Sequence, residues 1–228
     1  MTIRWPVHVL RPRDVLFEVS PRTLAAPASV SGATQTVASD AGLWKATYSN
    51  LIIRERNHVL AFRAIANLLE GRLGSIVIPL CRAYQPLPDG FTSTETAALL
   101  DGVPHWDDAP FGDDSEYEGG TMSVELSSGI SARAVSANIV VNYGGTIEPG
   151  QHFSIGERLY RVRTITYTTP TTAAITFRPP LREAAAAGAI LDFDDPVVRV
   201  RLASDDAMDL DLSGRRFANP SVSFIEDV

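Results

Sequence analysis

The segment from residue 48 to residue 80 constrains the fold more than any other, because it runs strand, helix, strand with almost no connecting loop. Residues 48–54 have the composition of a short strand, and residues 75–80 (SIVIPL) form a second one that stops near a proline. Between them, apolar residues recur at steps of three and four, which predicts an amphipathic helix over 57–73. Asn57 is the expected N-cap of this helix.

The predicted helix has one apolar face, which must pack on a sheet. We expect four side chains to be buried there: Phe62, Ile65, Ala66 and Leu69. Val59 and Leu73 fall on the same stripe, and Gly71 or Gly74 is the expected C-cap. The opposite face should expose Arg63, Asn67 and Glu70.

Three textures along the chain suggest the domain organisation. Residues 121–193 are short alternating strands separated by glycine, proline and threonine turns, with a tight hairpin at Gly156. An acidic, glycine-rich and proline-rich segment precedes them, and strand-like sequence follows them. We therefore predict a mainly β protein with one packed α-helix (α+β). Its first domain, 1–119 with 194–228, is expected to be β-sandwich-like, with a small β-barrel or sandwich module inserted at 121–193.

Composition excludes several classes of function. The 228 residues include 27 acidic and 20 basic side chains, for a formal charge of −7, whereas a nucleic-acid-binding protein usually has a basic face. No segment is long and apolar enough for membrane insertion, and the N-terminus lacks the apolar core of a signal peptide. Cys81 is the one cysteine, so no intramolecular disulfide is possible, and we expect it to act as a small buried hydrophobe.

The candidate chemistry is weak. The most enzyme-like cluster is in 105–118, with the residues His105, Asp107, Asp108, Asp113, Asp114 and Glu116. Their spacing does not match a calcium loop, so we interpret the segment as a solvated acidic loop. A second group of acids, Asp205, Asp206, Asp209 and Asp211, could serve glycoside hydrolysis, but that chemistry needs a defined separation of carboxylates across a cleft, which a sequence does not supply. We expect no catalytic residue, no bound metal and no cofactor.

Three stretches resemble the distal tail proteins and related minor tail-tip proteins of long-tailed bacteriophages. They are the helix end and returning strand ANLLEGRLGSIVIPL, the hairpin GQHFSIGERLYRVRTIT, and the closing strand NPSVSFIEDV. In that family a helix packs on strands that form a ring, and a small β module points outward. The chain departs from many relatives after the helix, where residues 76–82 stand in place of an aromatic F-R-W-x-D-P stretch.

The resemblance implies a structural, non-enzymatic part of a virion baseplate. Such a protein is made in the host cytoplasm and assembles at the tail tip as a ring of identical subunits, typically a hexamer, between the tail tube protein and the hub protein. Neighbouring copies would meet through the strands near 48–54, 75–80 and 221–225. The interface residues predicted on these strands are Tyr48, Leu51, Ile53, Ile76, Ile78, Val222 and Phe224.

Two other functions stay open at this point. The 121–193 module is a candidate host-glycan-binding module, with Tyr143, Tyr160 or Tyr167 as a stacking platform. A carboxylate-based hydrolase using 105–118, with Asp107 or Asp108 essential, is the third hypothesis.

Overall fold

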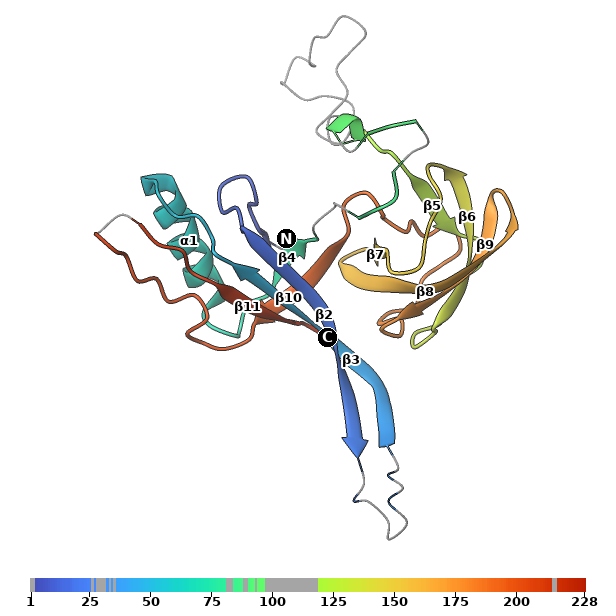
Figure 1. The fold of residues 1–228 in the computed structure, drawn as a ribbon, viewed down its shortest axis with the longest axis horizontal. Coiled ribbons are helices and arrows are strands. Elements are labelled where there is room, and N and C mark those ends of the chain that lie inside the picture. Colours follow the sequence, from blue (N-terminus) through green and yellow to red (C-terminus); the bar gives the residue numbers. More distant parts are fainter. Residues whose placement is uncertain are drawn as a thin grey trace, which may run out of the picture. The chain divides into compact units, whose positions relative to one another are not determined.

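Two β-sheets and one long helix make up most of the described chain (Figure 1). The computed structural model describes residues 3–25, 27, 32, 34, 36–80, 84–87, 90–92, 94–96, 119–214 and 217–228. The predicted fold class, mainly β with one packed α-helix, is confirmed. A short helical turn at 94–96 is the other helical segment among these residues.

The chain divides into a first unit, residues 1–80 with 198–228, and a second unit, residues 81–197. This division begins earlier than the expected boundary near residue 120, because Gln85 is bonded into the second unit. Its Nε2 donates to the carbonyls of His152 (2.6 Å) and Phe193 (2.9 Å), and its Oε1 accepts from the His152 amide (3.1 Å). The side chain of Gln85 is buried, so these bonds are shielded from water.

The first unit contains a six-stranded sheet. Its strands, in order across the sheet, are β1 (Ile3–Arg4), β4 (Ile76–Pro79), β10 (Val197–Leu202), β11 (Val222–Glu226), β3 (Thr36–Ser49) and β2 (Asp14–Ala25). β1 and β4 are parallel, whereas β10, β11, β3 and β2 pair antiparallel. The last strand of the chain is therefore interior, between β10 and β3.

An aromatic cluster joins distant parts of this unit. The rings of Trp5, Tyr48 and Phe224 meet edge to face, with centroids 5.6 to 5.8 Å apart, and all three are buried. The Tyr48 hydroxyl donates to the Pro79 carbonyl at 2.5 Å, which ties the end of β3 to β4. On β11, the buried carboxylate of Glu226 accepts from the Trp44 amide at 3.0 Å.

Helix α1 runs from Arg56 to Leu69. Phe62, Ile65 and Leu69 are buried as predicted, whereas Ala66 is only half-buried. The exposed face is as predicted. The N-cap is Glu55, without a side-chain hydrogen bond, and not Asn57, which lies in the first turn.

The helix ends four residues earlier than predicted. Glu70 takes a left-handed conformation (φ 46°), and the Gly74 amide then donates back to the Leu69 carbonyl at 2.8 Å. As a result Leu73 leaves the apolar stripe and is 82% exposed.

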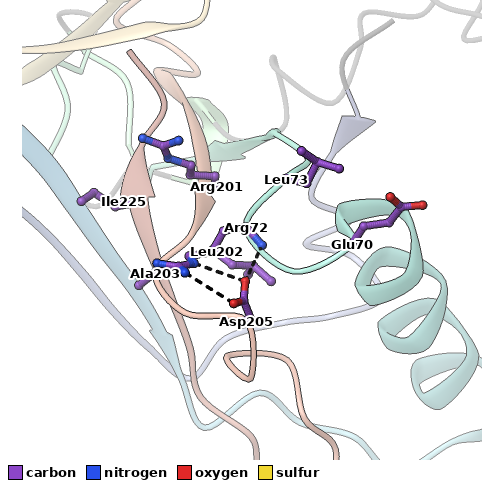
Figure 2. Close-up of a pocket in the computed structure, with 8 residues that line it drawn as sticks. All are labelled: Glu70, Arg72, Leu73, Arg201, Leu202, Ala203, Asp205 and Ile225. Carbon is purple, nitrogen blue, oxygen red and sulfur yellow. Dashed lines mark hydrogen bonds and ion pairs between the residues drawn. The ribbon is translucent and has the colours of Figure 1, made fainter.

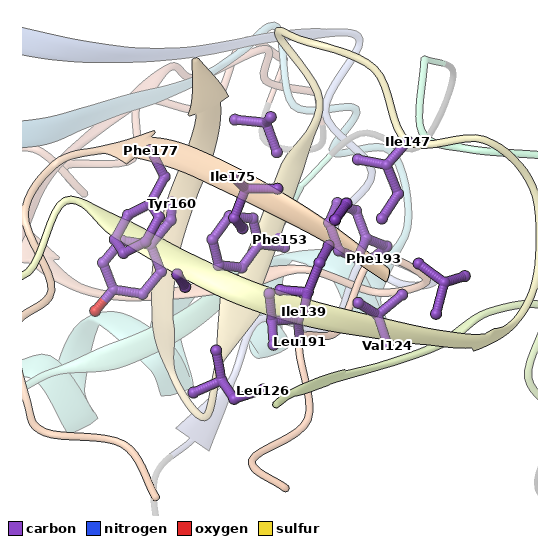
Figure 3. Packing of buried hydrophobic residues seen from close by; sticks show 14 of the residues in the cluster. Val124, Leu126, Ile139, Ile147, Phe153, Tyr160, Ile175, Phe177, Leu191 and Phe193 are labelled. Atoms are coloured by element: carbon purple, nitrogen blue, oxygen red, sulfur yellow. The ribbon is translucent and has the colours of Figure 1, made fainter. Parts of the chain in front are cut away.

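The second unit is a curled five-stranded antiparallel sheet. Its order is β5 (Ser123–Leu126), β6 (Ser136–Tyr143), β9 (Thr172–Arg178), β8 (Arg158–Thr169) and β7 (His152–Ile155). Gly156 (φ 58°) makes the predicted β7–β8 turn. Alternate residues of each strand point into one apolar core, where Phe153 packs against Tyr160, Phe177 and Phe193 with centroids 5.4 to 5.6 Å apart (Figure 3).

The buried face of α1 yields a stability prediction. We expect Phe62→Ala to lower the free energy of unfolding of the first unit by about 3–5 kcal/mol, because truncating a buried phenylalanine leaves a cavity. Asn67→Ala, at an exposed position of the same helix, should change it by no more than about 0.5 kcal/mol. Urea unfolding followed by circular dichroism measures both, and equal stability of the two variants would contradict the packing described here.

Candidate functional site

The seven predicted interface side chains lie inside the first unit. Each is at most 1% exposed: Tyr48, Leu51, Ile53, Ile76, Ile78, Val222 and Phe224. Strands β3, β4 and β11, which carry most of them, each have a hydrogen-bonded neighbour on both sides. We predicted these side chains at an assembly interface, but they form the core of the first unit, where a partner cannot reach them.

The accessible edge of this sheet is β2. Among the described residues β2 pairs only with β3, and it is the longer of the two edge strands, since β1 has two residues and β2 has twelve. A strand edge presents unpaired backbone groups to any partner strand. Near its start β2 also exposes apolar side chains, with Leu16 at 55% and Val15 at 37%.

The outer part of β2 and β3 is a two-stranded ribbon. Strand β11 pairs with β3 only at residues 45–48, whereas the β2–β3 register continues to Ala25 opposite Thr36. Figure 1 shows both strands running past the rest of their sheet. A two-stranded hairpin alone is marginally stable in water, so this ribbon has the geometry of an element that packs on another surface.

Edge β2 carries features that limit uncontrolled pairing. A register shift separates Ser20 from Arg22, which places Pro21 at a bulge. Asp14 and Glu18 are exposed on the same strand. Charges, proline and bulges on an edge strand restrict which partner strands can add to it.

The edges of the second unit are covered by its own chain. Residues 188–191 bond to β5, where the Leu191 amide donates to the Val124 carbonyl at 2.8 Å. At the other edge, the Asp192 amide donates to the Ser154 carbonyl of β7 (2.8 Å), and the Ser154 amide donates back (2.9 Å). One segment thus occupies both edges of the curled sheet, so β2 is the long open edge among the described strands.

The two ends of the inserted sheet are fastened together. The carboxylate of Asp194 accepts from the Thr121 amide at 2.8 Å, from the Thr121 hydroxyl, and from the Met122 amide at 3.1 Å. These bonds join the two residues before β5 to the segment after Phe193. They fall next to the expected ends of the β module at 121 and 193.

Among the described residues, His152 has a strongly shifted pKa. Burial lowers the pKa of His152 to about 3, with a further lowering from Arg161, whose Nε donates to His152 Nε2 at 2.8 Å. A general base for neutral pH needs a pKa near the working pH and contact with a substrate. His152 is 3% exposed and stays neutral, so we interpret it as a packing residue.

Its neighbours do not complete a nucleophilic triad. Ser154 lies two residues along β7, but its Oγ is buried and makes no hydrogen bond to the described residues. Burial raises the pKa of Asp192, whose Oδ1 accepts from the amides of Asp194 and Asp195 at 2.9 Å each. Its Oδ1 thus holds a turn of the chain.

One of the acids after β10, Asp205, forms an ion pair with Arg72. Figure 2 shows Arg72 and Asp205 facing each other in a groove of about 550 Å³ lined by β10, β11 and the turn after α1. Hydrogen bonds from Arg72, 3.1 to 3.4 Å long, lower the pKa of Asp205, and the Ser204 hydroxyl lowers that of Asp206. A glycosidase acid needs a raised pKa, so these two carboxyls do not fit that role.

The three tyrosines proposed as a sugar platform have different environments. Tyr160 is in the core, where its hydroxyl accepts from the Arg182 amide at 3.0 Å. Tyr143 and Tyr167 are exposed, but they lie on β6 and β8, with β9 between these strands. The structure does not bring the three rings together.

The remaining predicted residues fall outside the described ranges. They are Cys81 and the acidic cluster in 105–118, including Asp107 and Asp108. Among the residues that are described, no group of three histidine, cysteine or acidic side chains is arranged to hold a metal ion.

Comparison with known proteins assigns no family. No protein-family model matches the chain, and a search of curated proteins finds no match. None of the described helices is long and apolar enough to cross a membrane.

The pKa of His152 predicts a pH-dependent stability of the second unit. Its folded-state pKa lies below the ordinary 6.5, so its stabilising contribution is complete above pH 6.5 and is lost as the pH falls toward 3. Between pH 6.5 and 5 the loss should be about 2 kcal/mol, at about 1.4 kcal/mol per pH unit.

Urea unfolding at pH 7, 6 and 5 tests this dependence. His152→Gln keeps an acceptor for Arg161 and does not titrate, so its stability should fall less steeply with pH than that of the wild type. Identical slopes for the two proteins would show that His152 does not govern the acid sensitivity.

Proposed function

We propose that the chain is a non-catalytic structural subunit of a phage tail tip. It assembles with copies of itself into a closed ring, expected to have six members, between the tail tube protein and the hub protein. The observation that carries the proposal is the combination of a long open edge at β2 with a ribbon that extends past its sheet. The identification with tail-tip proteins rests on the resemblance of the helix end, the β7–β8 hairpin and the closing strand.

We place a head-to-tail contact at β2, which is both the open edge and one strand of the projecting ribbon. In such a heterologous contact this strand meets a different surface of the neighbouring copy, and a ring forms when the rotation closes. The other edge, β1, is only two residues long, so β2 is the more extensive pairing surface. We place the contact on β2 and its exposed Val15 and Leu16, instead of the buried residues first considered.

A second candidate function, host-glycan binding, has one observation in its favour. The outer face of β6, β9 and β8 has a groove of about 340 Å³ lined mainly by hydroxyl, amide and small apolar side chains. Across it, Thr164 and Thr176 are hydrogen-bonded at 2.5 Å. Hydroxyls and amides of this kind bind sugars, although the aromatic platform usual for such sites is not part of the groove.

The ring proposal predicts a discrete oligomer that depends on β2. Wild-type protein should give one oligomeric mass by light scattering at high concentration, and Leu16→Lys should shift it to the monomer, because a buried unpaired charge opposes strand pairing. Leu68→Lys replaces an equally exposed leucine on α1 and should leave the mass unchanged. Both variants should keep the wild-type circular dichroism spectrum.

Two results would contradict the ring. One is a wild-type protein that stays monomeric at high concentration and is absent from purified particles by mass spectrometry. The other is retention of the full-length chain on host surface polysaccharide, lost in Thr164→Val or Asn138→Ala, together with a monomeric mass. That pair of findings would favour the glycan-binding function.

A further inference from the structure

A second groove of the first unit, of about 650 Å³, lies along the first half of α1. Its apolar surface comes from Val59 and Leu60 of the helix and from Leu212 and Phe217 of the segment between β10 and β11. Phe217 is 53% exposed and Leu60 is 46% exposed. Large apolar side chains gathered in one exposed patch are typical of interaction sites, whereas single exposed apolar residues are common on any surface.

The exposed phenylalanine has an anchored backbone. The Phe217 amide and carbonyl both pair with Ser213, at 3.1 and 2.8 Å. The next residue, Ala218, pairs with Ile53 through two hydrogen bonds of 3.1 Å. These bonds attach the segment to the buried residue Ile53, between β3 and α1. The phenyl group of Phe217 is therefore held at the surface by fixed main-chain contacts, as in preorganised binding sites.

Three arginines surround this apolar surface. Arg54, Arg56 and Arg63 line the groove and are exposed, beside one acid, Glu55. No described residue gives their guanidinium groups a hydrogen bond or an ion pair. By contrast, Arg72 in the other groove of this unit is paired with Asp205. Within the described part of the chain, the three guanidinium groups have no partner and face solvent, where a ligand can reach them.

We propose that this groove binds an acidic peptide segment of a neighbouring protein, with an aromatic or aliphatic side chain as its anchor. The anchor packs on Phe217 and Leu60, and carboxylates of the same segment pair with the arginines, whose planar guanidinium groups match carboxylate geometry. The N-terminus of α1, which has no side-chain cap, adds positive potential at the same end.

A polyanion without apolar groups fits the groove less well. Nucleic acids and free phosphates would leave the apolar surface of Leu60 and Phe217 uncovered. The inference does not depend on the ring, because it uses no residue of β2.

The chain's own residues 101–118 supply a suitable probe. This stretch has seven acidic residues, no lysine or arginine, and three aromatic residues, Trp106, Phe111 and Tyr117. A labelled peptide of this sequence is titrated with the full chain and followed by fluorescence anisotropy. A second peptide has every Asp and Glu replaced by Asn and Gln, and a third has its three aromatic residues replaced by alanine.

Two triple variants of the protein separate a specific groove from general charge attraction. One is Arg54→Gln with Arg56→Gln and Arg63→Gln. The matched control removes the same charge at exposed arginines outside the groove, with the changes Arg13→Gln, Arg133→Gln and Arg163→Gln. Phe217→Ser tests the anchor, and thermal melting shows that each variant is folded.

We expect saturable binding of the first peptide, weakened about tenfold by the groove triple and by Phe217→Ser, and less than twofold by the control triple. The acid-free and aromatic-free peptides should each bind about tenfold more weakly, and Leu16→Lys should bind like the wild type whatever its oligomeric mass. Three results would overturn the proposal: no saturable binding at 1 mM peptide (about −4 kcal/mol or weaker), equal losses in both triple variants, or tighter binding of a single-stranded oligonucleotide of equal charge.

Discussion

The first unit depends on the position of its last strand. β11 lies between β10 and β3, so these two strands are joined only when β11 is in place. Its Phe224 completes the aromatic cluster with Trp5 and Tyr48. The carboxylate of Glu226 adds a buried bond to the Trp44 amide, which would be costly to leave unpaired. Contacts between residues so far apart in sequence form late, because the intervening chain must be ordered first.

The intervening chain is organised to fold by itself. Residues 81–197 have their own aromatic core around Phe153, and the Asp194 carboxylate joins their final segment to Thr121 and Met122. Closing that loop internally reduces the conformational entropy that the first unit would otherwise have to remove when its two parts meet. The same segment also covers the sheet edges at β5 and β7. The edges of the second unit at β5 and β7 are thus covered, whereas the first unit keeps β2 open.

Local patterns predicted local structure well. The steps of three and four identified Phe62, Ile65 and Leu69 as the buried face of the helix, and alternation identified the strands of the second unit and the turn at Gly156. The helix end was wrong by four residues, because periodicity does not reveal the left-handed turn at Glu70. The N-cap was also wrong, since Asn57 has the right chemistry but lies in the first turn, two residues after the N-cap Glu55.

Properties that depend on neighbours could not be predicted. An apolar strand such as β11 looks alike in sequence whether it is an interior strand or a subunit edge, so Val222 and Phe224 were assigned to an interface although they are core. The network of Gln85 with His152, and the groove that brings Phe217 to Arg54, join residues more than 60 positions apart, and no local pattern marks them. The two proposals for the first unit use separate surfaces. In the ring proposal, backbone groups along β2 would fix the direction and register of a neighbouring strand. In the groove proposal, the arginines around Phe217 would select a partner by charge and shape, so mutations could change assembly and partner choice independently.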